Sequence, residues 1–194
     1  PGMQAWRRVL SVQSHVVRGY CGNKAAVPML QLRGFDADAV NTVQFSNHTG
    51  YPSFTGSVVD GAGLLELVDG LEANGLLRGY SHLLTGYIGS PSLLEAVVEV
   101  LRRLRKHNPG LTYVCDPVMG DNGALYVPPD LPAIYRASVV PLATVVCPNQ
   151  FELEQLTERP AGSITTVDEA LAAVDALHAL GPETVVVSSL QLGA

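Results

Sequence analysis

The sequence contains little charge and no long hydrophobic run. Only 15% of its 194 residues are charged, and 12 Lys and Arg against 18 Asp and Glu give a formal net charge of −6. An acidic chain does not attract a phosphate backbone over its whole surface, which disfavours a general nucleic-acid-binding role. No apolar run approaches the roughly 20 residues that a membrane helix needs. Because 47% of the residues are hydrophobic, disorder is excluded as the main state.

Several motifs of metal and nucleotide chemistry are also missing. The three cysteines, Cys21, Cys115 and Cys147, form no CxxC pair, which excludes a zinc knuckle or a redox motif and favours free thiols in the reducing cytosol. The sequence has no P-loop, no GxGxxG and no GxSxG. Its two lysines, Lys24 and Lys106, lie at the ends of predicted helices, where neither suits a buried Schiff base.

Short apolar runs alternate with amphipathic segments along the whole chain. We predict strands at 9–13, 38–45, 81–87, 111–115, 144–147 and 184–187. We predict helices at 22–32, 64–73, 92–107, 131–138, 151–156 and 166–180. Strands that alternate with helices form a mostly parallel sheet with helices on both faces, so we expect one α/β domain over residues 1–194.

Ligands of open α/β sheets bind beyond the carboxyl ends of the strands. The residues that follow the predicted strands carry hydroxyl and amide groups and one carboxylate, and such groups suit a small polar ligand. Asp116 and Asp121 together could share a cation with phosphate oxygens. Each candidate also has a purely structural interpretation: Asn149 and Glu152 match a helix start, and Asp116 could cap a turn.

Five ordered blocks of sequence carry a resemblance to a known family. They are VLSVQSHV with GYCGN (9–16, 19–23), NTVQFSNHTGY (41–51), LTGY (84–87), VCDPVMGD (114–121) and PNQFE (148–152). Together they resemble the pyridoxal kinases of the ribokinase-like superfamily. The more distant hydroxymethylpyrimidine kinases share only the DPV and PN blocks. Hydroxymethylpyrimidine kinase is the alternative enzyme that the sequence leaves open. The resemblance implies a three-layer α/β/α fold and phosphorylation by ATP of the 5′-hydroxyl of pyridoxal, pyridoxine or pyridoxamine.

The resemblance also implies roles for single residues. The substrate-binding positions would be Ser14, Cys21, Thr49 and Tyr87. The ATP-binding positions would be Asp116, Asn149, Glu152, Ser188 and Ser189. Magnesium or another divalent cation would be held by Asp121, and potassium or sodium would lie by Asp116 and Cys147. The implied assembly is a homodimer.

Three departures from the family pattern qualify these expectations. Cys147 stands where the family usually has threonine, and the loop after Asp121 is short. The Gly-Thr-Gly-Asp motif, whose aspartate is the family's general base, does not occur in the sequence. We therefore expect a C-terminally truncated, incomplete kinase domain with little activity alone. The alternative is a non-catalytic isoform that binds ligand or dimerises with an intact kinase.

Overall fold

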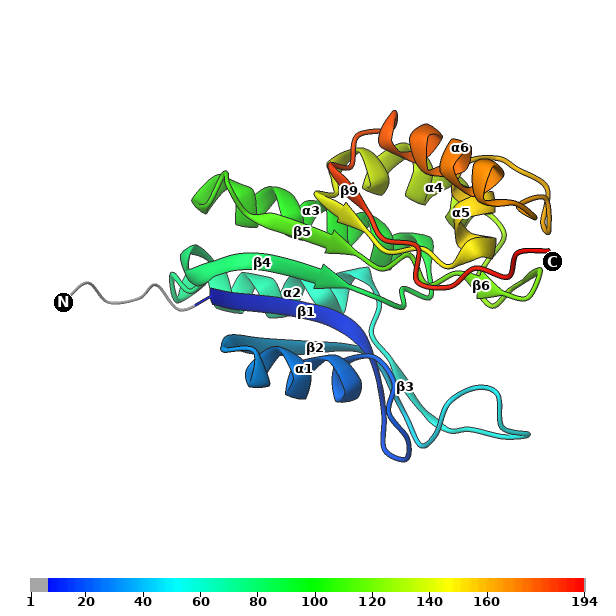
Figure 1. Ribbon diagram of the computed structural model, residues 1–194. Coiled ribbons are helices and arrows are strands. Elements are labelled where there is room, and N and C mark those ends of the chain that lie inside the picture. Colours follow the sequence, from blue (N-terminus) through cyan, green and yellow to red (C-terminus); the bar gives the residue numbers. More distant parts are fainter. Residues whose placement is uncertain (1–6, 194) are drawn as a thin grey trace.

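A seven-stranded sheet forms the centre of the computed structural model, which describes residues 7–193 (Figure 1). The strand order is β3-β2-β1-β4-β5-β8-β9. The strands are β1 (Arg7–Val16), β2 (Phe35–Phe45), β3 (Gly56–Val58), β4 (Tyr80–Thr85), β5 (Thr112–Cys115), β8 (Val145–Val146) and β9 (Thr184–Val185). All neighbours pair in parallel except β2 and β3. The predicted mostly parallel sheet is therefore confirmed.

Helices cover both faces of this sheet. They are α1 (Asn23–Leu32), α2 (Gly61–Ala73), α3 (Pro91–His107), α4 (Leu131–Ile134), α5 (Gln150–Leu156) and α6 (Val167–His178). Figure 1 shows α1 in front of β1 and β2, and α2 and α3 behind the sheet. This placement follows from right-handed crossovers, because the chain moves from β1 to β2 in one direction and from β4 to β5 in the other. The α/β/α layering is thus confirmed.

Local sequence explains where the main helices begin. The side chain of Ser90 accepts a hydrogen bond from the amide of Leu93 at the start of α3. Thr166 and Glu169 form a capping box at the start of α6, as their spacing predicts. The eight buried residues of α3 then form one stripe against the core.

The structure corrects two predicted loops and one predicted helix. The loop predicted up to residue 60 contains β3, which pairs antiparallel with the end of β2. The predicted glycine loop after β5 contains a second, two-stranded sheet of β6 (Gly120–Asp121) and β7 (Ala124–Leu125). The helix predicted at 131–138 is α4 followed by a π-helical turn, η2 (Tyr135–Val139). Two 3-10 turns, η1 (Leu77–Gly79) and η3 (Val140–Leu142), complete the elements.

The carboxyl ends of the parallel strands meet on the right-hand side of Figure 1. The β2–β3 hairpin loop and the β6–β7 hairpin both project from this side. Among residues 7–193, no helix is both long and apolar enough to cross a membrane. The strand ends and the two hairpins are therefore the framework on which a site can be built.

Candidate functional site

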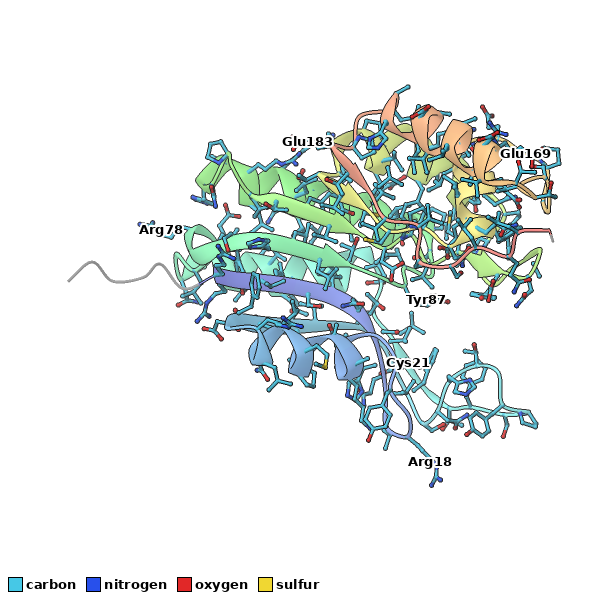
Figure 2. The ribbon with its side chains drawn as sticks, in the orientation of Figure 1. Arg18, Cys21, Arg78, Tyr87, Glu169 and Glu183 are labelled. Carbon is cyan, nitrogen blue, oxygen red and sulfur yellow. The ribbon has the colours of Figure 1, made fainter. Side chains whose placement is uncertain are left out.

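A cavity of about 520 Å³ lies beyond the carboxyl ends of β1, β2 and β4; we call it the strand-end cavity. Its lining includes all four predicted substrate residues, Ser14, Cys21, Thr49 and Tyr87. It also includes Asp116, which follows β5. Figure 2 shows the labelled Cys21 and Tyr87 at this end of the sheet. Residues from four separate segments of the chain are therefore gathered around one space.

A close backbone approach holds Ser14 in the cavity wall. The register of β1 against β2 shifts between Gln13 and His15, so Ser14 lies at an irregularity in the strand. Gly22, which precedes α1, has a φ of +51° and packs directly on Ser14. A Cβ at Gly22 would lie 2.1 Å from the Ser14 carbonyl oxygen and 2.6 Å from its Oγ. Only glycine permits this contact, so the GYCGN block shapes the site through its backbone.

Burial governs the ionisation of Asp116 and Tyr87 on this wall and of Cys147 beside it. Burial raises the pKa of Asp116 to about 6. Burial also raises the pKa of the Tyr87 hydroxyl, and it raises the pKa of the Cys147 thiol, with a smaller contribution from the Asp116 charge. A carboxylate kept in poor contact with water interacts strongly with any cation that approaches it. Asp116 is thus suited to a cationic or metal-bound ligand.

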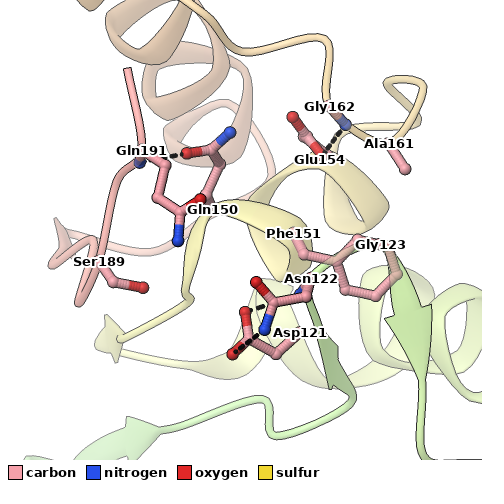
Figure 3. Close-up of a pocket in the computed structure, with 10 residues that line it drawn as sticks. All are labelled: Asp121, Asn122, Gly123, Gln150, Phe151, Glu154, Ala161, Gly162, Ser189 and Gln191. Carbon is pink, nitrogen blue, oxygen red and sulfur yellow. Dashed lines mark hydrogen bonds between the residues drawn. The ribbon is translucent and has the colours of Figure 1, made fainter. Parts of the chain in front are cut away.

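A second cavity, of about 390 Å³, adjoins the β6–β7 hairpin, and we call it the hairpin cavity (Figure 3). Asp121 and Ser189, two predicted phosphate-side residues, line it. The Asp121 carboxylate accepts hydrogen bonds from the backbone and the side-chain amide of Asn122 at 2.8 and 3.2 Å. On the opposite wall, the buried Glu154 carboxylate accepts from two backbone amides, of Gly162 and Ile164. Polar and apolar surface contribute about equally to its lining, and the cavity holds residues predicted for the nucleotide side of the site.

Two predicted ATP-binding residues are engaged by the protein itself. The side chain of Asn149 accepts from the amide of Glu152 at 2.8 Å and donates to the Gly120 carbonyl at 2.8 Å. Glu152 is only 3% exposed, and its two oxygens accept from the amides of Met119 and Asn149 at 2.9 Å. Burial raises the pKa of Glu152 to about 7, although the backbone hydrogen bonds oppose this shift. Both side chains therefore fix the loop after β5 and the start of the β6–β7 hairpin.

The remaining predicted residues lie beside the two cavities. Cys147 is half-buried at the end of β8, and its amide bonds the Cys115 carbonyl at 2.9 Å. The Ser188 hydroxyl donates to the Pro148 carbonyl at 3.3 Å. Neither residue is part of the lining of the strand-end or the hairpin cavity. Their side chains border the strand ends rather than form these walls.

The described residues, 7–193, bring no three His, Cys, Asp or Glu side chains together in a group that could hold a metal ion. The predicted ligands are separated because Asp116 lines the strand-end cavity, whereas Asp121 lines the hairpin cavity. Magnesium is commonly held by one or two carboxylates together with substrate phosphates and water. The donor set therefore fits a magnesium ion that arrives with a nucleotide rather than one caged by protein.

Sequence reasoning missed several residues of the strand-end cavity. These residues are Gln13, Val16, Gly22, Val43, Phe45, His48, Phe54, Val118 and Tyr126. Most belong to the quoted blocks, so position beside a predicted residue is the signal that could have found them. Phe54 and Tyr126 lie outside the blocks and have no such signal. Phe54 reaches the cavity because its ring packs on Phe45 with centroids 4.9 Å apart.

A family model described as phosphomethylpyrimidine kinase matches residues 79–193. The chain belongs to this family. Among its relatives, pyridoxal kinases of Arabidopsis thaliana and Homo sapiens are 58% and 50% identical over 186 and 189 residues. These matches cover 96% and 95% of the chain. The resemblance to pyridoxal kinases carried by the five blocks is thereby confirmed.

Solved structures of this family agree with the fold. Pyridoxal kinase from Leishmania donovani in complex with ADP and pyridoxamine matches with a TM-score of 0.90 and 38% identity, over 96% of this chain and 65% of that one. The enzyme from Trypanosoma brucei matches with a TM-score of 0.85 and 37% identity, over 97% and 64%. The chain spans about 59% of the length of the two curated relatives above.

Proposed function

We propose that this chain forms the substrate pocket and part of the nucleotide site of a pyridoxal kinase. The reaction transfers the γ-phosphoryl group of ATP to the 5′-hydroxyl of pyridoxal, pyridoxine or pyridoxamine. A new P–O bond forms to that hydroxyl, the bond to ADP breaks, and the hydroxyl proton leaves to a base. The observation that carries the proposal is the convergence of Ser14, Cys21, Thr49 and Tyr87 on one cavity.

Each wall of the strand-end cavity suits a part of such a substrate. Ser14 offers a hydroxyl that can bond the pyridine nitrogen, and Thr49 offers a second one from the β2–β3 loop. Tyr87 and Phe45 supply aromatic surface on which a planar ring can stack. A volume of about 520 Å³ is in the range of small-ligand sites.

The nucleotide side of the proposed site lies toward the hairpin cavity. Asp121 and Ser189 line this cavity, and Asp116 lies on the wall shared with the substrate. Magnesium, held by Asp121 and the ATP phosphates, would neutralise charge on the transferred group. Potassium or sodium would lie by Asp116 and Cys147. Asn149 and Glu152 would act on ATP through the loop and hairpin that they fix, rather than by contact.

We further propose that the protein forms a homodimer through α1. This helix buries only Asn23 and leaves Met29 and Leu32 56% and 76% exposed. Ala39 of the neighbouring strand β2 is also exposed. Analytical ultracentrifugation should give a dimer mass for the chain and a monomer mass for Leu32→Lys. A monomeric wild-type chain at micromolar concentration contradicts this assembly.

Binding of pyridoxal, measured by isothermal titration calorimetry on the 194-residue chain, tests the proposed function. We expect binding that weakens at least tenfold in Thr49→Val and Ser14→Ala. Hydroxymethylpyrimidine, the substrate type of the alternative enzyme, is titrated in parallel. Tighter binding of hydroxymethylpyrimidine than of pyridoxal favours the alternative, and binding of neither by folded protein overturns the proposal.

A matched control separates the cavity from general damage. Thr184→Val changes the same residue type in β9, away from both cavities. We expect this variant to bind pyridoxal as the wild-type chain does. Equal losses in Thr184→Val and Thr49→Val show that the strand-end cavity is not the binding site.

A further inference from the structure

A buried chain of polar side chains leads from α1 to the strand-end cavity. It consists of Asn23, Ser11 and Gln13, which are 3%, 0% and 7% exposed. Ser11 Oγ lies 2.8 Å from Asn23 Oδ1, and Gln13 Nε2 lies 2.9 Å from Ser11 Oγ. Of the three, Gln13 lines the cavity. None of these side chains is assigned a role in the proposed reaction above.

Asn23 fixes the direction of each hydrogen bond in this series of polar side chains. The side-chain nitrogen of Asn23 bonds the backbone carbonyl of Val40 at 2.9 Å. A carbonyl can only accept, so this atom must be the amide nitrogen, and Oδ1 must face Ser11. Since Oδ1 can only accept, the Ser11 hydroxyl gives it its single proton. The Ser11 oxygen then accepts a hydrogen bond from Gln13.

This polarity orients the amide of Gln13. Its nitrogen is used by Ser11, so its oxygen, Oε1, is the end left for other partners. Oε1 packs toward Gly86, where a Cβ would lie only 2.6 Å away. Among residues 7–193, Oε1 accepts no hydrogen bond, yet it is not one of the fully buried polar atoms that lack a partner. The oxygen therefore keeps access to the cavity that Gln13 lines.

We propose that Gln13 is a specificity-determining residue whose Oε1 accepts a hydrogen bond from a hydroxyl or amine of the ring ligand. The inference rests on the proposed function, because that function supplies a ligand with donors around a ring. A fixed acceptor selects for a donor and rejects an analogue that lacks it, since the oxygen is then left without a partner. The Ser11–Asn23 pair keeps the amide from turning over, so Ser11 is a positioning residue for this contact.

A binding cycle with four ligands tests the proposal. Calorimetry gives the dissociation constants of pyridoxine and of 3-deoxy-, 4-deoxy- and 5-deoxypyridoxine for the wild-type chain and for Gln13→Leu. We expect Gln13→Leu to weaken pyridoxine binding about 3- to 10-fold, the range of one neutral hydrogen bond. One of the three analogues lacks the hydroxyl that bonds Gln13, and Gln13→Leu should bind this analogue as tightly as the wild-type chain does. Equal weakening of all four ligands, or of none, overturns the proposal.

Two further variants keep the test decisive. Ser11→Ala frees the side-chain amide of Gln13 to turn over, so it should weaken pyridoxine binding about twofold. It should leave the binding of the analogue that lacks the bonded hydroxyl unchanged. This variant tests the proposal if Gln13→Leu does not fold. Gln31→Leu makes the matched change on an exposed residue of α1 and should bind all four ligands normally. A folded wild-type chain that binds no ligand overturns the proposed function itself, whereas binding without the selective coupling overturns only the role of Gln13.

Discussion

The backbone amide of Met119 donates a hydrogen bond to Oε1 of Glu152 at 2.9 Å. This bond ties the loop after β5 to the first turn of α5, across 33 positions of sequence. The second carboxylate oxygen accepts from the amide of Asn149, which completes the capping box of α5. Asp116 and Asp121 flank Met119 in the sequence. The carboxylate of Glu152 therefore sets the position of the segment that carries both acidic site residues.

Glu152→Gln should destabilise the fold. Gln has one acceptor oxygen where Glu has two, so either the Met119 or the Asn149 amide would face an NH₂ group. A buried donor left without an acceptor costs about 1–3 kcal/mol, and the removal of a buried charge offsets part of this cost. We expect a net loss of about 1–2 kcal/mol in the free energy of unfolding, measured with urea at pH 8, where the Glu152 carboxyl is ionised in the folded state.

The matched control for this variant is Glu66→Gln, on the exposed face of α2. A surface change of this kind should stay within about 0.5 kcal/mol of the wild-type chain. If both variants unfold at the wild-type urea concentration, the two hydrogen bonds of Glu152 add nothing to stability, and its assigned structural role is wrong.

The buried Asp116 should make the protein less stable as pH rises. Its pKa is raised from 3.8 to about 6 by burial, so between about pH 4 and 6 the folded state holds more protons than the unfolded state. Stability then falls through this window, and the full penalty remains above pH 6. Asp116→Asn removes the titration, so at pH 8 this variant should be about 1–2 kcal/mol more stable than the wild-type chain.

Urea unfolding at pH 4 and pH 8 measures this effect. The gain in Asp116→Asn should shrink to about 0.5 kcal/mol at pH 4, where the wild-type carboxyl is protonated in the folded state and about half protonated in the unfolded state. Asp175→Asn, an exposed change on α6, should show no such pH-dependent gain. A gain of equal size at both pH values would mean that the Asp116 charge is not the cause.

Turnover by the chain alone should be slow. Asp116 is the one acidic residue in the described lining of the strand-end cavity, and the resemblance places it by the ATP phosphates. Without a second carboxylate to take the hydroxyl proton, the rate should fall about 10²–10⁴-fold. We expect the purified 194-residue chain to form pyridoxal 5′-phosphate at least about 100-fold more slowly than a full-length relative. Equal rates would show that a residue of this chain acts as the base.

The sequence predicted the parallel sheet and most helices because their hydrophobic periodicity is strong, as in α3. It missed β3, whose three residues are all exposed and carry no such signal. The β6–β7 hairpin, in contrast, has a signal in the sequence. Asn122 and Gly123 have φ values of +50° and +79°, and an Asn-Gly pair is a strong sign of a tight hairpin turn.

The candidate site was predicted in part. Four of the five blocks carry residues that the fold gathers into one cavity, because each of the four covers the end of a strand of the same sheet. The sequence predicted that Asn149 and Glu152 start a helix, which their capping box confirms, but it did not reveal their long-range hydrogen bonds to Gly120 and Met119. The sequence also did not predict the orientation of the Gln13 amide, because that orientation depends on the hydrogen bond from Asn23 to the Val40 carbonyl in β2. Such long-range hydrogen bonds leave no periodic pattern.

Two glycines at the ends of α1 allow steric contact to be separated from backbone strain. Gly22 and Gly34 have φ values of +51° and +80°, so alanine is strained at both, at a cost of about 1–2 kcal/mol. At Gly34 nothing lies within 4 Å of the added Cβ, whereas at Gly22 it would meet the carbonyl oxygen of Ser14 at 2.1 Å. We expect Gly34→Ala to lose stability and keep its pyridoxal affinity. Gly22→Ala should also displace Ser14 and weaken pyridoxal binding at least about tenfold, the loss expected when a hydrogen bond and its supporting contacts are removed. Thermal melts and calorimetry on both variants measure the two effects separately. Equal pyridoxal affinities in the two variants would mean that Ser14 does not contact the ligand.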